Sequence, residues 1–230
     1  MIENKEYKKK LNTDGFCIVH NIFSSQEIES ILNLINHSQK KYAIRQLINH
    51  YPKIKDLIFS NPVFNKLFSS ICDKNYFLSK AIYFNKPSKS NWFVGYHQDL
   101  SISVQKIQET KGFSNCTNKN KQIGVIPPLR IVENTITFRI HLDSTDETNG
   151  ALKVLVNSHN RGIIRIDSTF NKQSWKALTC HVPKGGVMLM KPLLLHASAK
   201  STSKNDRRVI HLEFCNEHIP MGWLEKKRVS

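Results

Sequence analysis

The N-terminal part of the chain carries apolar residues at the spacing of amphipathic helices. One stripe follows Ser24 and Glu27, which are placed to form a capping box, and it consists of Ile28, Ile31, Leu32 and Ile35. A second stripe follows Asn61-Pro62, a typical helix cap and first turn, and it consists of Phe64, Leu67, Phe68 and Ile71. We therefore predict that residues 1–78 form a helical segment.

The spacing changes to that of β-strands from about residue 79. Residues 135–143 alternate strictly, with one face made of Ile136, Phe138, Ile140 and Leu142. Other apolar runs of strand length cover residues 81–84, 92–94, 187–190, 193–195 and 208–214. Many short strands after a helical opening predict a mainly β fold, a sheet sandwich or jelly roll over residues 79–216 that the N-terminal helices buttress.

The chain has 230 residues, the size of one well-cored domain, and no linker-like stretch divides it. Residues 103–130 are polar and irregular, and a loop of this length predicts a lid or a binding loop. No apolar run reaches the length of a membrane span, and the N-terminus lacks the pattern of a signal peptide. The five cysteines are scattered, which indicates reduced thiols and a cytoplasmic location.

The formal net charge is +16. Such a charge fits an acidic partner such as nucleic acid or a membrane surface, and it fits equally a well-solvated basic surface. No aromatic residues alternate with the basic ones, which are dispersed in short groups: Lys8 to Lys10, Lys40-Lys41, Lys119 with Lys121, and Lys226 to Arg228. This dispersal argues against a nucleic-acid partner, and only the charge suggests a nucleic-acid demethylase.

Two His-x-Asp motifs are candidate metal ligands, His97-Gln98-Asp99 and His141-Leu142-Asp143. On a strand, residues two apart point to the same face. With a second histidine from a distant strand, either motif would give two imidazoles and one carboxylate, a set that holds ferrous iron and leaves positions open. The spacing does not choose between the motifs. Gly95 ahead of the first favours a close backbone approach there, whereas Asp143 leads into a polar turn.

His196 and an arginine after it are the candidates to complete such a site. A lone histidine at the end of an apolar strand is more often a core residue than a ligand. In the strand that follows, the alternation places Arg207 with His211 and Glu213, and Arg208 with the apolar residues. We therefore expect Arg207 to face the polar site.

The order of several blocks resembles a known family over residues 14–215. The blocks are Asp14-Gly15-Phe16, Asn91-Trp92, Tyr96 to Leu100, Asn149 to Leu152, Asn157-Ser158-His159, Gly185 to Met190, Leu195 to Ser198 and Arg207-Arg208. In these blocks the chain resembles a bacterial member of the phytanoyl-CoA dioxygenase family. The resemblance implies a double-stranded β-helix (a jelly roll, cupin-like) that uses non-haem Fe(II) with 2-oxoglutarate as co-substrate.

The resemblance also implies roles for individual residues. The metal ligands would be His97, Asp99 and His196, while His141 and Asp143 would lie on a structural strand. Arg207 would pair with the far carboxylate of 2-oxoglutarate, and Ser198 would lie near the same group. Lys86 is a looser match to a co-substrate contact.

These roles imply an oxygenase that uses O2 and releases succinate and CO2. Related iron halogenases lack the carboxylate ligand, so the presence of Asp99 favours hydroxylation of a small organic substrate. No CoA-binding motif is visible, and the family name does not indicate the substrate. Two other classes stay open, a non-catalytic jelly-roll module that binds a ligand or a metal and a zinc hydrolase, because two histidines and a carboxylate also suit zinc. The sequence does not indicate the oligomeric state.

Overall fold

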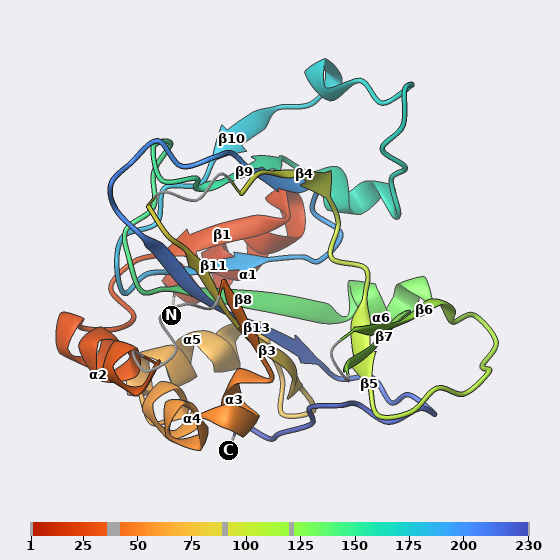
Figure 1. Ribbon diagram of the computed structural model, residues 1–230, viewed down its shortest axis with the longest axis horizontal. Coiled ribbons are helices and arrows are strands. Elements are labelled where there is room, and N and C mark those ends of the chain that lie inside the picture. Colours follow the sequence, from red (N-terminus) through yellow and green to blue (C-terminus); the bar gives the residue numbers. More distant parts are fainter. Residues whose placement is uncertain (1, 36–41, 89–91, 120–121, 230) are drawn as a thin grey trace.

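The computed structural model describes residues 2–35, 42–88, 92–119 and 122–229, and Figure 1 displays their arrangement. Of the residues singled out above, Lys40, Lys41, Asn91 and Lys121 lie outside these ranges. The N-terminal helices are α1 (Ile2–Asp14), α2 (Ser25–Ile35), α3 (Leu47–His50), α4 (Pro52–Phe59) and α5 (Pro62–Ile71). Within the described ranges, none of the helices has the length and apolar character that a membrane crossing requires.

Two antiparallel sheets form the body of the fold. The first has six strands, in the order β1 (Phe16–Val19), β11 (Val187–Met190), β8 (Thr135–His141), β13 (Arg207–Cys215), β3 (Phe77–Lys86) and β2 (Ala43–Arg45). The second has four strands, in the order β10 (Ala177–Thr179), β9 (Leu152–Leu155), β12 (His196–Ser198) and β4 (Val94–His97). Side chains of both sheets, such as Met188 and Val154, share one apolar cluster, so the sheets face each other. The expected double-stranded β-helix is confirmed.

The outer face of the six-stranded sheet is covered by the N-terminal helices (Figure 1). The apolar stripes predicted for α2 and α5 are buried in one cluster with Ile140, Leu212 and Phe214 of the sheet. Each such side chain contributes roughly 1.5–3 kcal/mol of transfer free energy on full burial. The helical buttress therefore leaves the inner face of the sheet free to carry polar residues.

The caps of α2 and α5 form as the sequence predicts. The backbone N–H of Ser24 donates to Glu27 Oε2 at 2.8 Å, and the backbone N–H of Phe64 donates to Asn61 Oδ1 at 2.7 Å. The Asn61 amide also donates to Glu27 Oε1 at 2.7 Å. The two caps are thus joined, which fixes the two helices to each other at their N-terminal ends.

The N-terminal segment is less purely helical than expected. Gly15, with φ at +87°, follows α1, and the apolar run after it becomes β1, an edge strand paired with β11. Strand β2 is a second exception within residues 1–78, and β3 already begins at Phe77. Short segments flanked by helices became strands because the sheet edges supply backbone partners.

Two further expectations about strands were wrong. Residues 193–195 form a turn that precedes β12, because the Leu194 N–H closes onto the Lys191 carbonyl at 3.0 Å. Trp92 and Phe93 precede β4, which begins at Val94.

The described residues within 103–130 contain a small sheet, where an irregular loop was expected. Strands β5 (Ile102–Val104), β7 (Gln122–Ile126) and β6 (Ser114–Lys119) pair in that order, and α6 (Leu129–Glu133) follows. The β6 segment, Ser-Asn-Cys-Thr-Asn-Lys, lacks apolar alternation, so its sequence does not read as a strand. In Figure 1 this small sheet lies beside the end of the β-helix.

The C-terminal residues close the edge of β3, where Glu225 accepts a hydrogen bond from the Ala81 N–H at 2.9 Å. Burial raises the pKa of Glu225 to about 7, although this hydrogen bond opposes the shift. The folded protein therefore binds the proton more tightly than the unfolded chain does. This contribution to stability is present below the unfolded pKa and is lost as the pH rises through about 7.

Replacing Glu225 by glutamine should remove this pH dependence. At pH 8 we expect the free energy of unfolding of Glu225→Gln to exceed that of the wild type by on the order of 2 kcal/mol. Near pH 4 we expect the two free energies of unfolding to be similar. Urea unfolding at the two pH values measures the difference. The matched control is Glu147→Gln, at an exposed carboxylate, which should follow the wild type. Equal stability of Glu225→Gln and wild type at pH 8 would contradict the assignment.

Candidate functional site

The pairing of β4 with β12 brings two histidines together. His97 and His196 are direct cross-strand partners, although they are 99 positions apart in the sequence. Their ring centroids lie 4.3 Å apart. Directly opposite side chains on one face of an antiparallel pair are within contact distance, so the register itself places the two imidazoles side by side.

Asp99 lies next to both rings. One of its oxygens is 3.8 Å from His97 Nε2, and the other is 3.6 Å from His196 Nε2. Its backbone N–H donates to the Pro192 carbonyl at 2.9 Å, which ties the segment after β4 to the turn before β12. One ligand atom from each of the three residues lies within 4.8 Å of the others, a spacing suited to one shared metal ion.

Both imidazoles are oriented by backbone carbonyls. His97 Nδ1 is 2.9 Å from the Gly95 carbonyl, and His196 Nδ1 is 2.9 Å from the Leu194 carbonyl. A carbonyl oxygen only accepts, so each Nδ1 carries the proton and each Nε2 keeps its lone pair toward Asp99. Metal-binding histidines are held in the same way.

The charge states also suit a cation. Burial lowers the pKa of His196 to about 4, against the pull of Asp99. For Asp99, burial opposes ionisation, but the imidazoles of His196, His211 and His97 outweigh it and hold the pKa below its usual range. A neutral imidazole and an ionised carboxylate are the forms that bind divalent metals.

A basic group lies near the three candidate ligands, and its Ser198 and Arg207 line one cavity with His97, Asp99 and His196. Arg207 Nη1 donates to the Gly150 carbonyl at 2.8 Å, and Ser198 Oγ donates to the same carbonyl at 2.9 Å. Lys86 Nζ is 3.2 Å from Ser198 Oγ and also donates to the Ala199 carbonyl. Burial and the charge of Arg207 lower the pKa of Lys86 to about 8. The sequence-predicted residues Lys86, Ser198 and Arg207 are therefore neighbours.

The second His-x-Asp motif, His141 and Asp143, makes other contacts than the first motif does. Asp143 accepts hydrogen bonds from Arg208 Nε at 2.8 Å and Nη2 at 2.7 Å, a bidentate ion pair. His141 Nδ1 is 3.4 Å from Thr145 Oγ1. Among the described residues, neither His141 nor Asp143 belongs to a group that could hold a metal.

Two site residues, Arg139 and His211, were not assigned a role from the sequence. They are cross-strand partners on β8 and β13, and both line the cavity of about 150 Å³ that also contains the His97, Asp99 and His196 side chains. Alternation did place them on polar faces, but it cannot tell which strands pair. The signal available was a charged residue, Arg139, on the polar face of a strand that also carries Thr135, Thr137 and His141.

His211 and Glu213 could form a second metal group with Asp99, but their hydrogen bonds oppose it. Arg139 Nη1 lies 3.0 Å from His211 Nδ1, and an arginine only donates. The His211 proton is therefore on Nε2, which donates to Glu213 at 3.0 Å. Both ring nitrogens are engaged, so His211 has no lone pair left for a metal.

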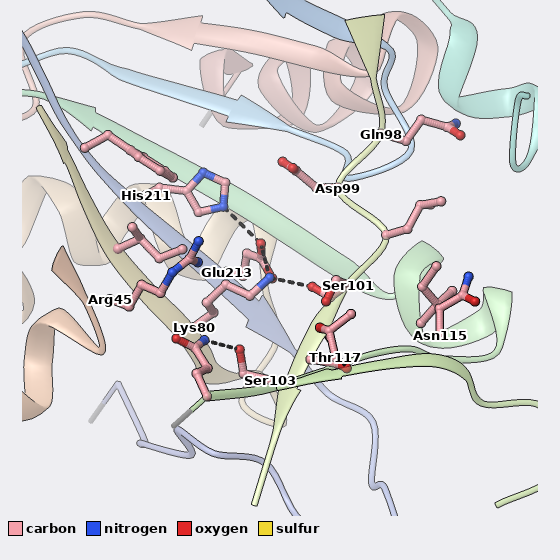
Figure 2. A pocket seen from close by; sticks show the side chains of 16 residues that line it. Arg45, Lys80, Gln98, Asp99, Ser101, Ser103, Asn115, Thr117, His211 and Glu213 are labelled. Atoms are coloured by element: carbon pink, nitrogen blue, oxygen red, sulfur yellow. Dashed lines mark hydrogen bonds and ion pairs between the residues drawn. The ribbon is translucent and has the colours of Figure 1, made fainter. Parts of the chain in front are cut away.

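A larger cavity of about 470 Å³ adjoins the candidate metal site and shares Asp99 with it (Figure 2). Its walls come from β3, β13 and the small sheet of β5, β6 and β7. Polar side chains dominate the lining: Arg45, Lys80, Ser101, Ser103, Asn115, Thr117, Gln122 and Glu213. In Figure 2, Lys80 contacts Glu213 and Ser101, and Gln98 points away from this group toward the loop at residues 162–164 that it binds.

A family model described as phytanoyl-CoA dioxygenase (PhyH) matches residues 11–209, a range that includes His97, Asp99, His196 and Arg207. The chain belongs to the phytanoyl-CoA dioxygenase family. Members of this family use Fe(II) and 2-oxoglutarate. A curated relative, phytanoyl-CoA dioxygenase domain-containing protein 1 homolog from Dictyostelium discoideum, is 27% identical and is matched over 90% of this chain and 65% of its own length.

Several solved structures share this fold at low sequence identity. The α-ketoglutarate-dependent epimerase SnoN from nogalamycin biosynthesis has a TM-score of 0.70 at 11% identity, covering 93% of this chain and 83% of its own. HygX from Streptomyces hygroscopicus with iron bound has a TM-score of 0.66 at 12% identity, covering 98% and 97%. At such identities the likeness establishes the fold. That this family member is of a bacterial type stays a prediction.

Gly150 fits where no side chain could. Its φ is +78°, and an added Cβ would lie 2.7 Å from the Ala199 carbonyl oxygen and 2.8 Å from Lys86 Nζ. We expect Gly150→Ala to lower the free energy of unfolding by about 1–3 kcal/mol, measured by urea denaturation. Gly95→Ala is the matched control, because its Cβ would meet only the Phe93 ring, at 3.8 Å. Equal stability of both variants would show that the atoms around Gly150 can move aside to accommodate a Cβ.

Proposed function

We propose that this protein is an Fe(II)- and 2-oxoglutarate-dependent dioxygenase that hydroxylates a small organic substrate. The observation that carries the proposal is the pairing of His97 with His196 beside Asp99, with one ligand atom of each within 4.8 Å of the others. Two imidazoles and one carboxylate leave coordination positions open for co-substrate and oxygen. A zinc hydrolase would need no buried cations at the far end of the cavity, whereas Lys86 and Arg207 are both there.

The residues present fit both groups. The iron would be held by His97, Asp99 and His196. The Nε of Arg207 is buried and has no hydrogen-bond partner, so it could donate to an anion. When bound, iron and 2-oxoglutarate supply the activation of O2, with succinate and CO2 as co-products. The residues of the chain would bind and orient these two groups and shield them from water.

Arg207 would bind the far carboxylate of 2-oxoglutarate. Its guanidinium presents a planar fork that suits a carboxylate, and the Gly150 carbonyl holds one side of it in place. The hydroxyl of Ser198 and the ammonium of Lys86 lie within reach of the same carboxylate. Apolar Leu152 and Phe84 line the cavity beside them and exclude water.

The substrate would enter the polar cavity of about 470 Å³, since this cavity reaches Asp99. Its lining has many hydrogen-bonding groups, including the partnerless, buried Oε1 of Gln122. Among the described residues Arg45 makes no ion pair, so it is available to an anionic group. These walls offer many hydrogen-bonding partners to a compact, polar substrate.

Removing the Asp99 carboxylate should abolish tight iron binding. We expect wild-type protein with Fe(II) and 2-oxoglutarate, without oxygen, to develop the visible charge-transfer band of the chelate, and Asp99→Ala to lose it. Asp143→Ala is the matched control, because it removes the carboxylate of the other His-x-Asp motif and should keep the band. Metal analysis that finds zinc and no chelate band in the wild type would point to the hydrolase instead.

Removing the Arg207 guanidinium should weaken the binding of 2-oxoglutarate and leave the binding of iron unchanged. We expect Arg207→Ala to raise the dissociation constant of 2-oxoglutarate by about 100-fold, since a charged hydrogen bond contributes roughly 1.5–3 kcal/mol. Titration of the chelate band gives the constant. Arg208→Ala serves as control and should bind 2-oxoglutarate like the wild type, because Arg208 pairs with Asp143. The reverse pattern would assign the role to Arg208.

A further inference from the structure

Arg139 is a buried arginine in the middle of the candidate active site. It lies on the inner face of β8, with Met188 of β11 on one side and His211 of β13 on the other. The residue is only 5% exposed. Its side chain lines the same cavity as the three candidate metal ligands, and its guanidinium carbon lies 5.9 Å from the centre of the Phe84 ring.

A chain of hydrogen bonds holds the Arg139 guanidinium in place. Lys80 Nζ contacts Glu213 at 2.8 Å, Glu213 accepts from His211 Nε2 at 3.0 Å, and His211 Nδ1 accepts from Arg139 Nη1 at 3.0 Å. Figure 2 shows the Lys80, Glu213 and His211 part of this chain. Because His211 is a neutral acceptor here, it orients the guanidinium without neutralising its charge. The Nε of Arg139 is buried and has no partner.

The cavity therefore carries more positive than negative charge. Within the described ranges, no carboxylate lies at ion-pair distance from Lys86, Arg139 or Arg207. Burial, together with the charge of Arg139, lowers the pKa of Arg207 to about 9. Unpaired buried cations are costly to a folded protein, and a cluster of them at a cleft indicates an anionic ligand.

The two arginines have different neighbours along the cavity. Arg139 Nη1 lies 3.0 Å from His211 Nδ1, and a ring nitrogen of His211 lies within 4.8 Å of a carboxylate oxygen of Asp99. Arg207 instead contacts the Gly150 carbonyl and lies beside Lys86. Arg139 is thus placed at the metal end, and Arg207 at the far end.

We propose that Arg139 binds the carboxylate next to the keto group of 2-oxoglutarate, so that each carboxylate of the co-substrate meets its own guanidinium. This inference rests on the proposed function. It makes Arg139 a binding residue for any 2-oxo acid, whereas Arg207 selects for those with a second carboxylate. His211 and Glu213 then act as positioning residues.

Two co-substrate probes separate the two roles. 2-Oxoglutarate has both carboxylates, whereas 2-oxobutyrate keeps the 2-oxo acid end and lacks the far carboxylate. Both are titrated into the Fe(II)-loaded protein without oxygen, by calorimetry and by the chelate band. We expect Arg139→Gln to lower the affinity for both ligands by a similar factor of about 10 to 100. Arg207→Gln should weaken 2-oxoglutarate alone and leave 2-oxobutyrate unchanged.

The chelate band gives a second readout that does not depend on affinity. Arg139→Gln removes a charge beside the metal-bound carboxylate and should shift the band position at saturating 2-oxoglutarate, whereas Arg207→Gln should leave it in place. Arg139→Lys keeps the charge and should restore part of the affinity. Arg208→Gln, whose partner is Asp143, is the control and should behave as the wild type in all titrations.

The possible failures are distinguishable. If the wild type forms no chelate band with Fe(II) and 2-oxoglutarate, the proposed function itself is wrong. If the wild-type band forms and Arg139→Gln binds both probes as tightly as the wild type with an unshifted band, only the role of Arg139 is wrong. Weakening of 2-oxoglutarate alone by Arg139→Gln would also overturn it, because that pattern belongs to a residue at the far carboxylate.

Discussion

The antiparallel pairing of β4 with β12 is the contact on which the site depends. It sets His97 opposite His196, and the segment that leaves β4 is pinned to the turn before β12 through Asp99 and Pro192. Backbone hydrogen bonds of a sheet are short-ranged and directional, so a shift of one residue would turn one imidazole to the other face. The metal geometry is thus a property of strand register more than of the side chains.

The six-stranded sheet makes a polar interior possible. Its outer face packs against the helices through Phe138, Ile140, Leu212 and Phe214, so the apolar contacts of β8 and β13 lie mainly on that face. The inner face of β8 and β13 can then carry Arg139, His211 and Glu213, all buried and bonded to one another. Fold stability and chemistry are divided between the two faces of the same strands.

The sequence predicted the helices, the alternation of β8 and the face on which Arg207 lies, because each is a local pattern. The spacing alone could not separate His97-Gln98-Asp99 from His141-Leu142-Asp143, and only the neighbouring residues and the family resemblance favoured the first motif. The partners, His196 for one motif and Arg208 for the other, come from distant strands. Likewise the β6 strand was not predicted, because its residues are polar and pair through backbone hydrogen bonds. Such pairing does not require an alternation of apolar and polar side chains. Arg139 was visible as a charged residue on an inward face, but its role needed the neighbouring strands.

The unbalanced cations around Gly150 and Arg139 have a consequence for the lifetime of the protein. A fold that holds unpaired buried charges is less stable alone than with a dianion in place, and a ligand that binds only the folded state stabilises it by mass action. The co-substrate would then act as a structural counterion as well as a reactant. Starved of it, the protein would open more often and expose its strands to proteases, so its abundance in a cell would follow the supply of the small dianion that it consumes.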